Sequence, residues 1–152
     1  MKNLFSKTLL GLALVLGASA TASAYEIIKP DPLVRIGKLD NGLTYYIRHN
    51  NYPEHHADFF IAQNVGSIQE EDNQRGLAHF LEHLAFNGTR HFPSNSIVKF
   101  LESYGAKFGQ DINAHTSFCE TVYKLQLPTA SPSLTDSAMA IMADWASALT
   151  LD

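Results

Sequence analysis

The sequence has 152 residues, of which 45% are hydrophobic and 17% are charged. This composition suits one globular domain and excludes an extensively disordered chain. The net charge is −4 and the basic residues form no continuous stripe, which argues against nucleic acid as a partner. The single cysteine, Cys119, excludes an internal disulfide framework and a cysteine-rich zinc knuckle, so a metal here would need histidine and carboxylate ligands.

Residues 1–24 have the features of a secretory signal peptide. Lys2 and Lys7 precede an apolar run, Leu9 to Leu16, that is short for a membrane span. The small residues at 22–24 predict cleavage between Ala24 and Tyr25, and those at 18–20 are the second choice. We therefore expect a mature chain of residues 25–152 that is exported, either to a periplasm or out of the cell. An uncleaved N-terminal anchor is the alternative.

The first part of the mature chain is predicted to be β structure. Residues 27–35 contain two prolines and indicate an extended lead-in. Asp40-Asn41-Gly42 is typical of a tight turn. Residues 43–48 and 57–65 are rich in aromatic and β-branched side chains, which predicts two strands. We expect these two strands to pair antiparallel as a hairpin, with residues 50–56 as the loop.

A helix is predicted from Gly76 to Gly88, after a solvated acidic loop at residues 67–75. The acids of that loop precede the helix, where negative charge favours the positive end of the helix dipole. Gly88 is a good helix stop. The spacing of four apolar residues predicts an apolar face, with the histidines of the helix away from its centre; these residues are Leu77, Phe80, Leu81 and Leu84.

Four further elements are expected after this helix. Residues 97–104 form a short helix that Ser94 or Ser96 caps, and it ends at Gly105. Residues 107–116 predict an irregular edge strand, and residues 120–127 alternate as a half-buried strand. Residues 133–149 repeat apolar side chains at helical spacing. The predicted fold class is α+β, an antiparallel or mixed sheet with helices packed on one face.

The helix at 76–88 carries the residues with clear chemical potential. His79 and His83 are four residues apart, so both imidazoles lie on one helix face, where they can hold one metal ion. Glu82 lies beside them and can accept a proton from water. This order, His-x-x-Glu-His, is the inverted form of a zinc-peptidase motif. The motif alone has moderate weight, because histidine and glutamate are common in this chain.

The residues around the motif resemble those of the M16 metallopeptidases, the family of pitrilysin, insulin-degrading enzyme and mitochondrial processing peptidase. The run from Gly76 to Thr89 resembles the active-site helix of this family. Further similarity lies at residues 39–43, at Gly66-Ser67, at residues 108–117 and at 121–128. The similar segments occur in the same order and extend over about residues 37–149.

The resemblance implies zinc-dependent hydrolysis of peptide bonds. His79 and His83 would bind zinc and Glu82 would act as general base. Asn113 and Ala114 would hydrogen-bond an extended peptide substrate, which suits an exposed strand edge. A turn residue is the alternative interpretation of Asn113, and His115 is expected at the rim of the site.

Catalytic zinc needs three protein ligands and a water, and the motif supplies two ligands. In the M16 family the third is a glutamate on a later helix, so we expect this chain to be the N-terminal part of a longer peptidase, with the third ligand beyond residue 152. Possible partners are then the remaining portion or a partner subunit. Four acids within the chain are less favoured substitutes: Asp111, Glu120, Asp144 and Asp152. A non-catalytic peptide-binding or scaffold fragment is the alternative function.

Overall fold

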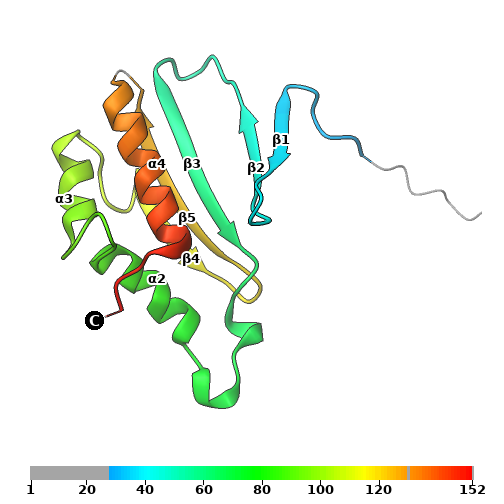
Figure 1. The fold of residues 1–152 in the computed structure, drawn as a ribbon, viewed down its shortest axis with the longest axis vertical. Coiled ribbons are helices and arrows are strands. Elements are labelled where there is room, and N and C mark those ends of the chain that lie inside the picture. The colour runs from blue at the N-terminus through cyan, green and yellow to red at the C-terminus, as the bar shows by residue number, and fades with distance from the viewer. Residues whose placement is uncertain (1–27, 130, 152) are drawn as a thin grey trace, which may run out of the picture. The chain divides into compact units, whose positions relative to one another are not determined.

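The computed structural model describes residues 28–129 and 131–151, so the predicted signal peptide lies outside the described residues. The chain divides into two units, residues 1–49 and residues 50–152. Among the described residues, no helix has the length and apolar character needed to cross a membrane. The elements in chain order (Figure 1) are β1 (Val34–Lys38), β2 (Thr44–Arg48), β3 (His56–Gln63), the 3-10 turns η2 (Ser67–Gln69) and η3 (Asp72–Gln74), α2 (Leu77–Asn87), α3 (Ser96–Ser103), β4 (Ile112–Thr116), β5 (Thr121–Pro128) and α4 (Pro132–Ser147).

The first unit contains an antiparallel hairpin of β1 and β2, in register from Val34 opposite Arg48 to Lys38 opposite Thr44. The predicted turn at residues 40–42 joins them. Gly42 has a φ of +92°, which favours glycine, and the side chain of Asn41 accepts the N–H of Leu43 at 3.1 Å. Val34 and Arg35, the last residues of the predicted extended lead-in, are already part of the paired strand β1, which was not predicted.

The second unit is built on a three-stranded antiparallel sheet in the order β3-β5-β4. The predicted hairpin of residues 43–48 with residues 57–65 is wrong, because β2 pairs with β1 and β3 pairs with β5. The tight turn at residues 40–42 closes β1–β2 at little entropic cost. β3 and β5 instead match alternating side chains over eight residues each, which puts Phe59 opposite Leu125.

Helices α2 and α4 cover one face of this sheet (Figure 1). The ring of Tyr123 on β5 stacks on Trp145 of α4, with ring centres 5.3 Å apart, and Phe86 of α2 meets Trp145 edge-on at 5.4 Å. Two helices and the central strand thus share one aromatic cluster. Aliphatic side chains complete the core around it, among them Ile97, Leu101, Ile112, Leu125, Leu134 and Ile141. The α+β class with helices on one face is confirmed.

Helix α2 begins and ends as predicted but turns a different face inward. Glu82 and Ala85 are its buried residues, whereas three of the residues expected on its apolar face are 40–58% exposed in the described part of the chain; they are Leu77, Phe80 and Leu81. The small side chain of Ala85 lets the helix approach the sheet closely. Phe86, one position further, fills the aromatic cluster.

The predicted capping of α3 by Ser94 or Ser96 is wrong. Asn95 occupies the N-cap position with a φ of +59° and makes no side-chain capping bond. The hydroxyl of Ser96 is buried without a hydrogen-bond partner. Instead, the N–H of Asn95 donates to the carbonyl of Asn87, so the end of α2 holds the start of α3.

Candidate metal and catalytic site

His79 and His83 project from adjacent turns of α2, with their Nε2 atoms 3.1 Å apart. Two imidazoles bound to one tetrahedral zinc at about 2.0–2.1 Å would place these atoms roughly 3.3 Å apart. Both side chains are exposed rather than packed in the core. The donor set and its spacing therefore fit a zinc ion without rearrangement of the helix.

Glu82 lies between the histidines in sequence but on the inward side of the helix, and it is 8% exposed. The hydroxyl of Thr116, the last residue of β4, donates to its Oε2 at 2.5 Å. Burial, together with the negative charge of Glu82, raises the pKa of Tyr123 to about 12. Glu82 is thus fixed in a partly apolar environment next to the exposed histidine pair.

Glu70 holds the N-terminus of α2 from the preceding connection. Its two carboxylate oxygens accept the N–H groups of Gly76 at 2.7 Å and Ala78 at 2.8 Å. These backbone hydrogen bonds lower the pKa of Glu70. The expected effect of acidic charge before the helix is confirmed for Glu70. Its hydrogen bonds hold the first turn of α2, up to the residue before His79.

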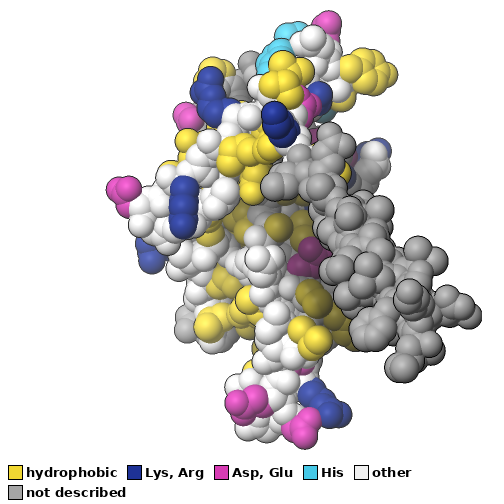
Figure 2. Space-filling view, turned by 90° about the vertical axis from the view of Figure 1, so that its right-hand side faces the viewer, with side chains coloured by type: hydrophobic (Ala, Val, Ile, Leu, Met, Phe, Trp, Pro, Cys, Tyr) yellow, Lys and Arg dark blue, Asp and Glu magenta, His cyan; other side chains and the backbone are white. Residues whose placement is uncertain are grey.

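The connection between β3 and α2 is otherwise polar, as expected. Figure 2 shows acidic and basic side chains together at the lower tip of the molecule, where Figure 1 places this connection. Its exposed charged residues include Glu71, Asp72 and Arg75. The connection nevertheless contains the two 3-10 turns η2 and η3, so it is more ordered than the predicted loop.

A groove of about 460 Å³ lies beside His79. Its two sides are joined by backbone hydrogen bonds: the N–H of Ser67 donates to Ser117, and that of Ile68 donates to Phe118. Gly66 permits this close approach, because a Cβ there would lie 2.3 Å from the carbonyl oxygen of Ser117. The groove is lined by Ser67, Glu70, Gly76, His79, Thr116, Ser117 and Phe118.

Asn113 and Ala114, the predicted substrate-binding residues, lie on β4 at an edge of the three-stranded sheet. The N–H of Gln126 donates to the carbonyl of Asp111, which by antiparallel alternation turns the backbone groups of Ala114 away from β5. The Asn113 side chain accepts the N–H of Ala114 at 3.0 Å. A peptide on this edge would therefore have to displace the Asn113 amide or pair beside it.

Within the described part of the chain, no third candidate ligand lies beside the histidines. The described residues contain no group of three or more His, Cys, Asp or Glu side chains able to hold a metal. Of the four substitutes considered, Asp111 accepts the N–H of Lys107, Glu120 lies 3.8 Å from His115, and Asp152 lies outside the described residues.

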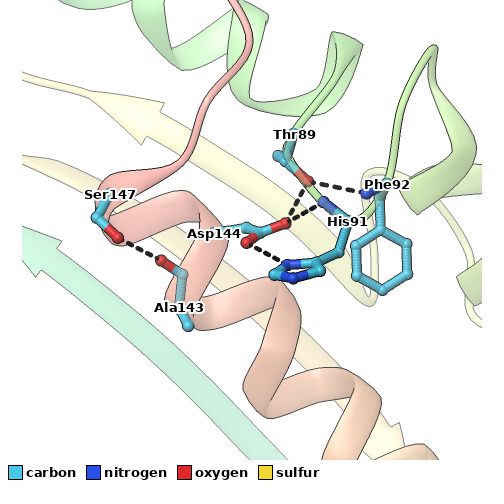
Figure 3. A network of polar contacts seen from close by, with 6 residues as sticks. All are labelled: Thr89, His91, Phe92, Ala143, Asp144 and Ser147. Atoms are coloured by element: carbon cyan, nitrogen blue, oxygen red, sulfur yellow. Dashed lines mark hydrogen bonds and ion pairs between the residues drawn. The ribbon is translucent and has the colours of Figure 1, made fainter.

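The fourth substitute, Asp144, is buried in a separate network (Figure 3). Its carboxylate accepts the hydroxyl of Thr89 at 2.7 Å, the N–H of His91 at 2.9 Å and the Nδ1 atom of His91 at 2.8 Å. These contacts join α4 to the segment after α2. Asp144 therefore has a structural role.

Sequence reasoning missed two supporting residues, Thr116 as the partner of Glu82 and Glu70 as a specific helix cap. The alternation of side chains along the strand could have indicated Thr116. Residues 112, 114 and 116 share a face, and burial of Ile112 marks that face as the one toward the helices. Glu70 could not be singled out from sequence, because three neighbouring acids precede the helix.

Comparisons with known proteins give matches over most of this chain. The sequence model of the insulinase family, peptidase family M16, matches residues 45–152. A probable zinc protease, PqqL of Escherichia coli, is 40% identical over all of this chain, and a PQQL-like zinc protease of Arabidopsis thaliana is 49% identical over 73% of it. This chain spans only 16% and 12% of the lengths of those two relatives.

Solved structures give the same result. The first half of the periplasmic protease PqqL from Escherichia coli matches with a TM-score of 0.79 and 41% identity, over 84% of this chain and 27% of that one. An insulinase-family protease from Yersinia pestis matches with a TM-score of 0.71 and 30% identity, over 84% and 28% of the two chains. The chain belongs to the insulinase family of peptidases, M16.

Proposed function

We propose that this chain carries two zinc ligands and the general base of a zinc-dependent metalloendopeptidase. The observation that carries the proposal is the spacing of His79 and His83, with Nε2 atoms 3.1 Å apart, beside the positioned carboxylate of Glu82. The names of the relatives, which include zinc proteases, support it. His79 and His83 would hold the zinc through their Nε2 atoms.

Zinc, when bound, polarises the scissile carbonyl and lowers the pKa of water. The residues of this chain do the rest. Glu82 takes a proton from the attacking water through the carboxylate oxygen that Thr116 does not hold, and returns it to the leaving amine. The groove beside His79 orients the peptide, and the outward backbone of Ala114 offers strand-like pairing, with Asn113 as the adjacent polar group.

We infer that the site is completed by residues other than those described. Catalytic zinc has three protein ligands, and residues 28–129 and 131–151 bring only two together. A glutamate from another segment or from a partner subunit would supply the third. The predicted signal peptide and the periplasmic relative support an exported protein.

The lack of a third ligand among the described residues also favours one alternative, a non-catalytic peptide-binding module. The substitution Glu82→Gln, made in the full-length protein, distinguishes the peptidase from the peptide-binding module. We expect the variant to bind zinc as the wild type does and to lose hydrolysis of an unstructured peptide, because the amide cannot take the proton. Wild-type protein that binds zinc and peptide but cleaves nothing would support the binding module instead.

A further inference from the structure

The hydroxyl of Thr116 is the one protein donor to the carboxylate of Glu82 among the described residues, at 2.5 Å from Oε2. We propose that Thr116 is a positioning residue for the general base. Its hydroxyl holds Oε2 so that Oε1 is directed at the water to be deprotonated. This inference rests on the proposed function and adds a residue to it that lies 34 positions from Glu82 on a different element.

The direction of this hydrogen bond follows from the neighbouring groups. An ionised carboxylate can only accept, so Thr116 must donate. The hydroxyl of Thr121 is a donor, at 2.9 Å to the carbonyl of Val65 and at the longer distance of 3.5 Å to the Thr116 oxygen. Thr116 is an acceptor in the contact with Thr121, so its own hydrogen is available to Glu82.

The second carboxylate oxygen, Oε1, accepts no hydrogen bond from any residue of the described ranges. Ser96 Oγ is the unpartnered side-chain polar atom that is fully buried in the described ranges, so Oε1 of the 8% exposed Glu82 keeps some contact with solvent. One oxygen of Glu82 is thus held by Thr116, and the other has no protein donor among the described residues. A base that must take a proton from water requires this asymmetry.

Thr116 is well placed to fix a carboxylate. It lies opposite Thr121 in the β4–β5 pair, and the N–H of the next residue, Ser117, donates to the carbonyl of Glu120, so the backbone around Thr116 is held. Its β-branched side chain has a stiff χ1. Glu82, in contrast, has three rotatable side-chain bonds. Without the hydroxyl, its carboxylate would sample orientations that do not face the water.

The test compares Thr116→Val, which keeps the shape, with Thr116→Ser, which keeps the hydroxyl, and with Thr116→Ala. Thr44→Val, at an exposed position of β2, is the control for the loss of a hydroxyl from a strand threonine outside the proposed site. In the full-length protein, we expect kcat to fall about 10- to 100-fold in Thr116→Val and Thr116→Ala. This is the typical range for residues that orient a group at a metal site. The KM should stay within about twofold, and the Ser variant should recover most of kcat.

Two readouts do not depend on activity. Calorimetric zinc affinity should be the same in wild type and Thr116→Val, because the histidines are untouched. Crystal structures of the metal-free proteins should show the Glu82 carboxylate displaced in the Val and Ala variants and unmoved in Thr116→Ser. Wild-type kcat in Thr116→Val, or an unmoved carboxylate, would overturn the inference.

Failure of the proposed function has a different signature. Wild-type protein would then show no zinc-dependent cleavage, and the crystallographic comparison alone would decide whether Thr116 positions Glu82. If Thr116→Val does not fold, Thr116→Ala is compared with Thr116→Ser by the same measurements. Equal loss of kcat in Ala and Ser would mean that the methyl group, not the hydroxyl, matters, and the inference would be wrong.

Discussion

The indole N–H of Trp145 donates to the backbone carbonyl of Ala85 at 3.0 Å, and both groups are buried. Ala85 is in the last turn of α2, where carbonyls lack a helical donor. The carbonyl of Leu84 is taken by Gly88, and that of Asn87 by Asn95. Trp145 thus completes the end of the helix that carries the histidine pair.

Replacement of Trp145 by Phe should destabilise the protein by about 1–3 kcal/mol, because it leaves the buried Ala85 carbonyl without a donor. Urea unfolding followed by circular dichroism measures this change. Met139→Leu, at an exposed position of the same helix, is the control and should be nearly neutral. Equal stability of Trp145→Phe and wild type would show that water satisfies the carbonyl.

Glu70→Gln tests the cap on the N-terminus of α2. The pKa of Glu70 is lowered by the backbone N–H groups of Ala78 and Gly76, so its ionised form favours the folded state. This contribution is complete above the usual pKa of 4.5 and is lost as the pH falls through the lowered value of the folded protein. We expect a lower Tm for the variant at neutral pH and a difference that closes in acid.

The control for Glu70 is Glu54→Gln, at an exposed acid in the polar loop before β3. Its Tm should follow that of the wild type at every pH. If the Tm difference between Glu70→Gln and the wild type persists unchanged below the lowered pKa, the shape of the side chain rather than its charge stabilises the helix N-terminus.

Much of the fold was predictable from local patterns. The helix at 76–88, the turn at 40–42 and the strand at 121–128 each have strong signals in adjacent residues, namely helix-stop glycine, Asn-Gly and period-two alternation. Strand pairing was not predictable in this way. β3 pairs with β5 rather than with its sequence neighbour β2, and the paired residues are 58 to 72 positions apart, from Gln63 opposite Thr121 to His56 opposite Pro128.

The site likewise contains residues that local sequence predicts and one partner that it does not predict. The relation of His79, Glu82 and His83 follows from helix geometry alone. The partner of Glu82, in contrast, comes from an edge strand through the sheet register. The inward face of α2 was mispredicted because apolar content favours Leu77, Phe80 and Leu81, whereas close packing on the sheet selects Ala85 and the aromatic ring of Phe86.

Asp144→Asn should be more damaging than Glu70→Gln. Burial pushes the pKa of Asp144 up, but hydrogen bonds from Thr89 and His91, together with the charge of His91, lower it overall. An asparagine would turn an N–H toward one of these donors, with an expected loss of about 1–3 kcal/mol. The carboxylate's contribution is present above its usual pKa of 3.8 and disappears as the pH falls through the lowered value.

Unfolding of Asp144→Asn in urea, from neutral pH to below 3.8, measures both effects. Asp136→Asn, an exposed acid on the same helix, is the matched control. Zinc affinity should change little, because Asp144 belongs to the network around Thr89 and His91. A large loss of zinc affinity with intact stability would instead make Asp144 a metal ligand.

Replacement of either histidine tests the metal site most directly. His79→Ala or His83→Ala leaves one imidazole, so we expect zinc affinity to fall by at least about 100-fold, beyond the effect of losing an outer partner. Calorimetry and metal analysis measure it. Both histidines are exposed, so Tm without metal should be close to that of the wild type. His115→Ala, an exposed histidine on β4, is the control and should bind zinc normally. Unchanged zinc affinity in both His79→Ala and His83→Ala would place the metal elsewhere. The proposed role of Glu82 as general base would then be wrong.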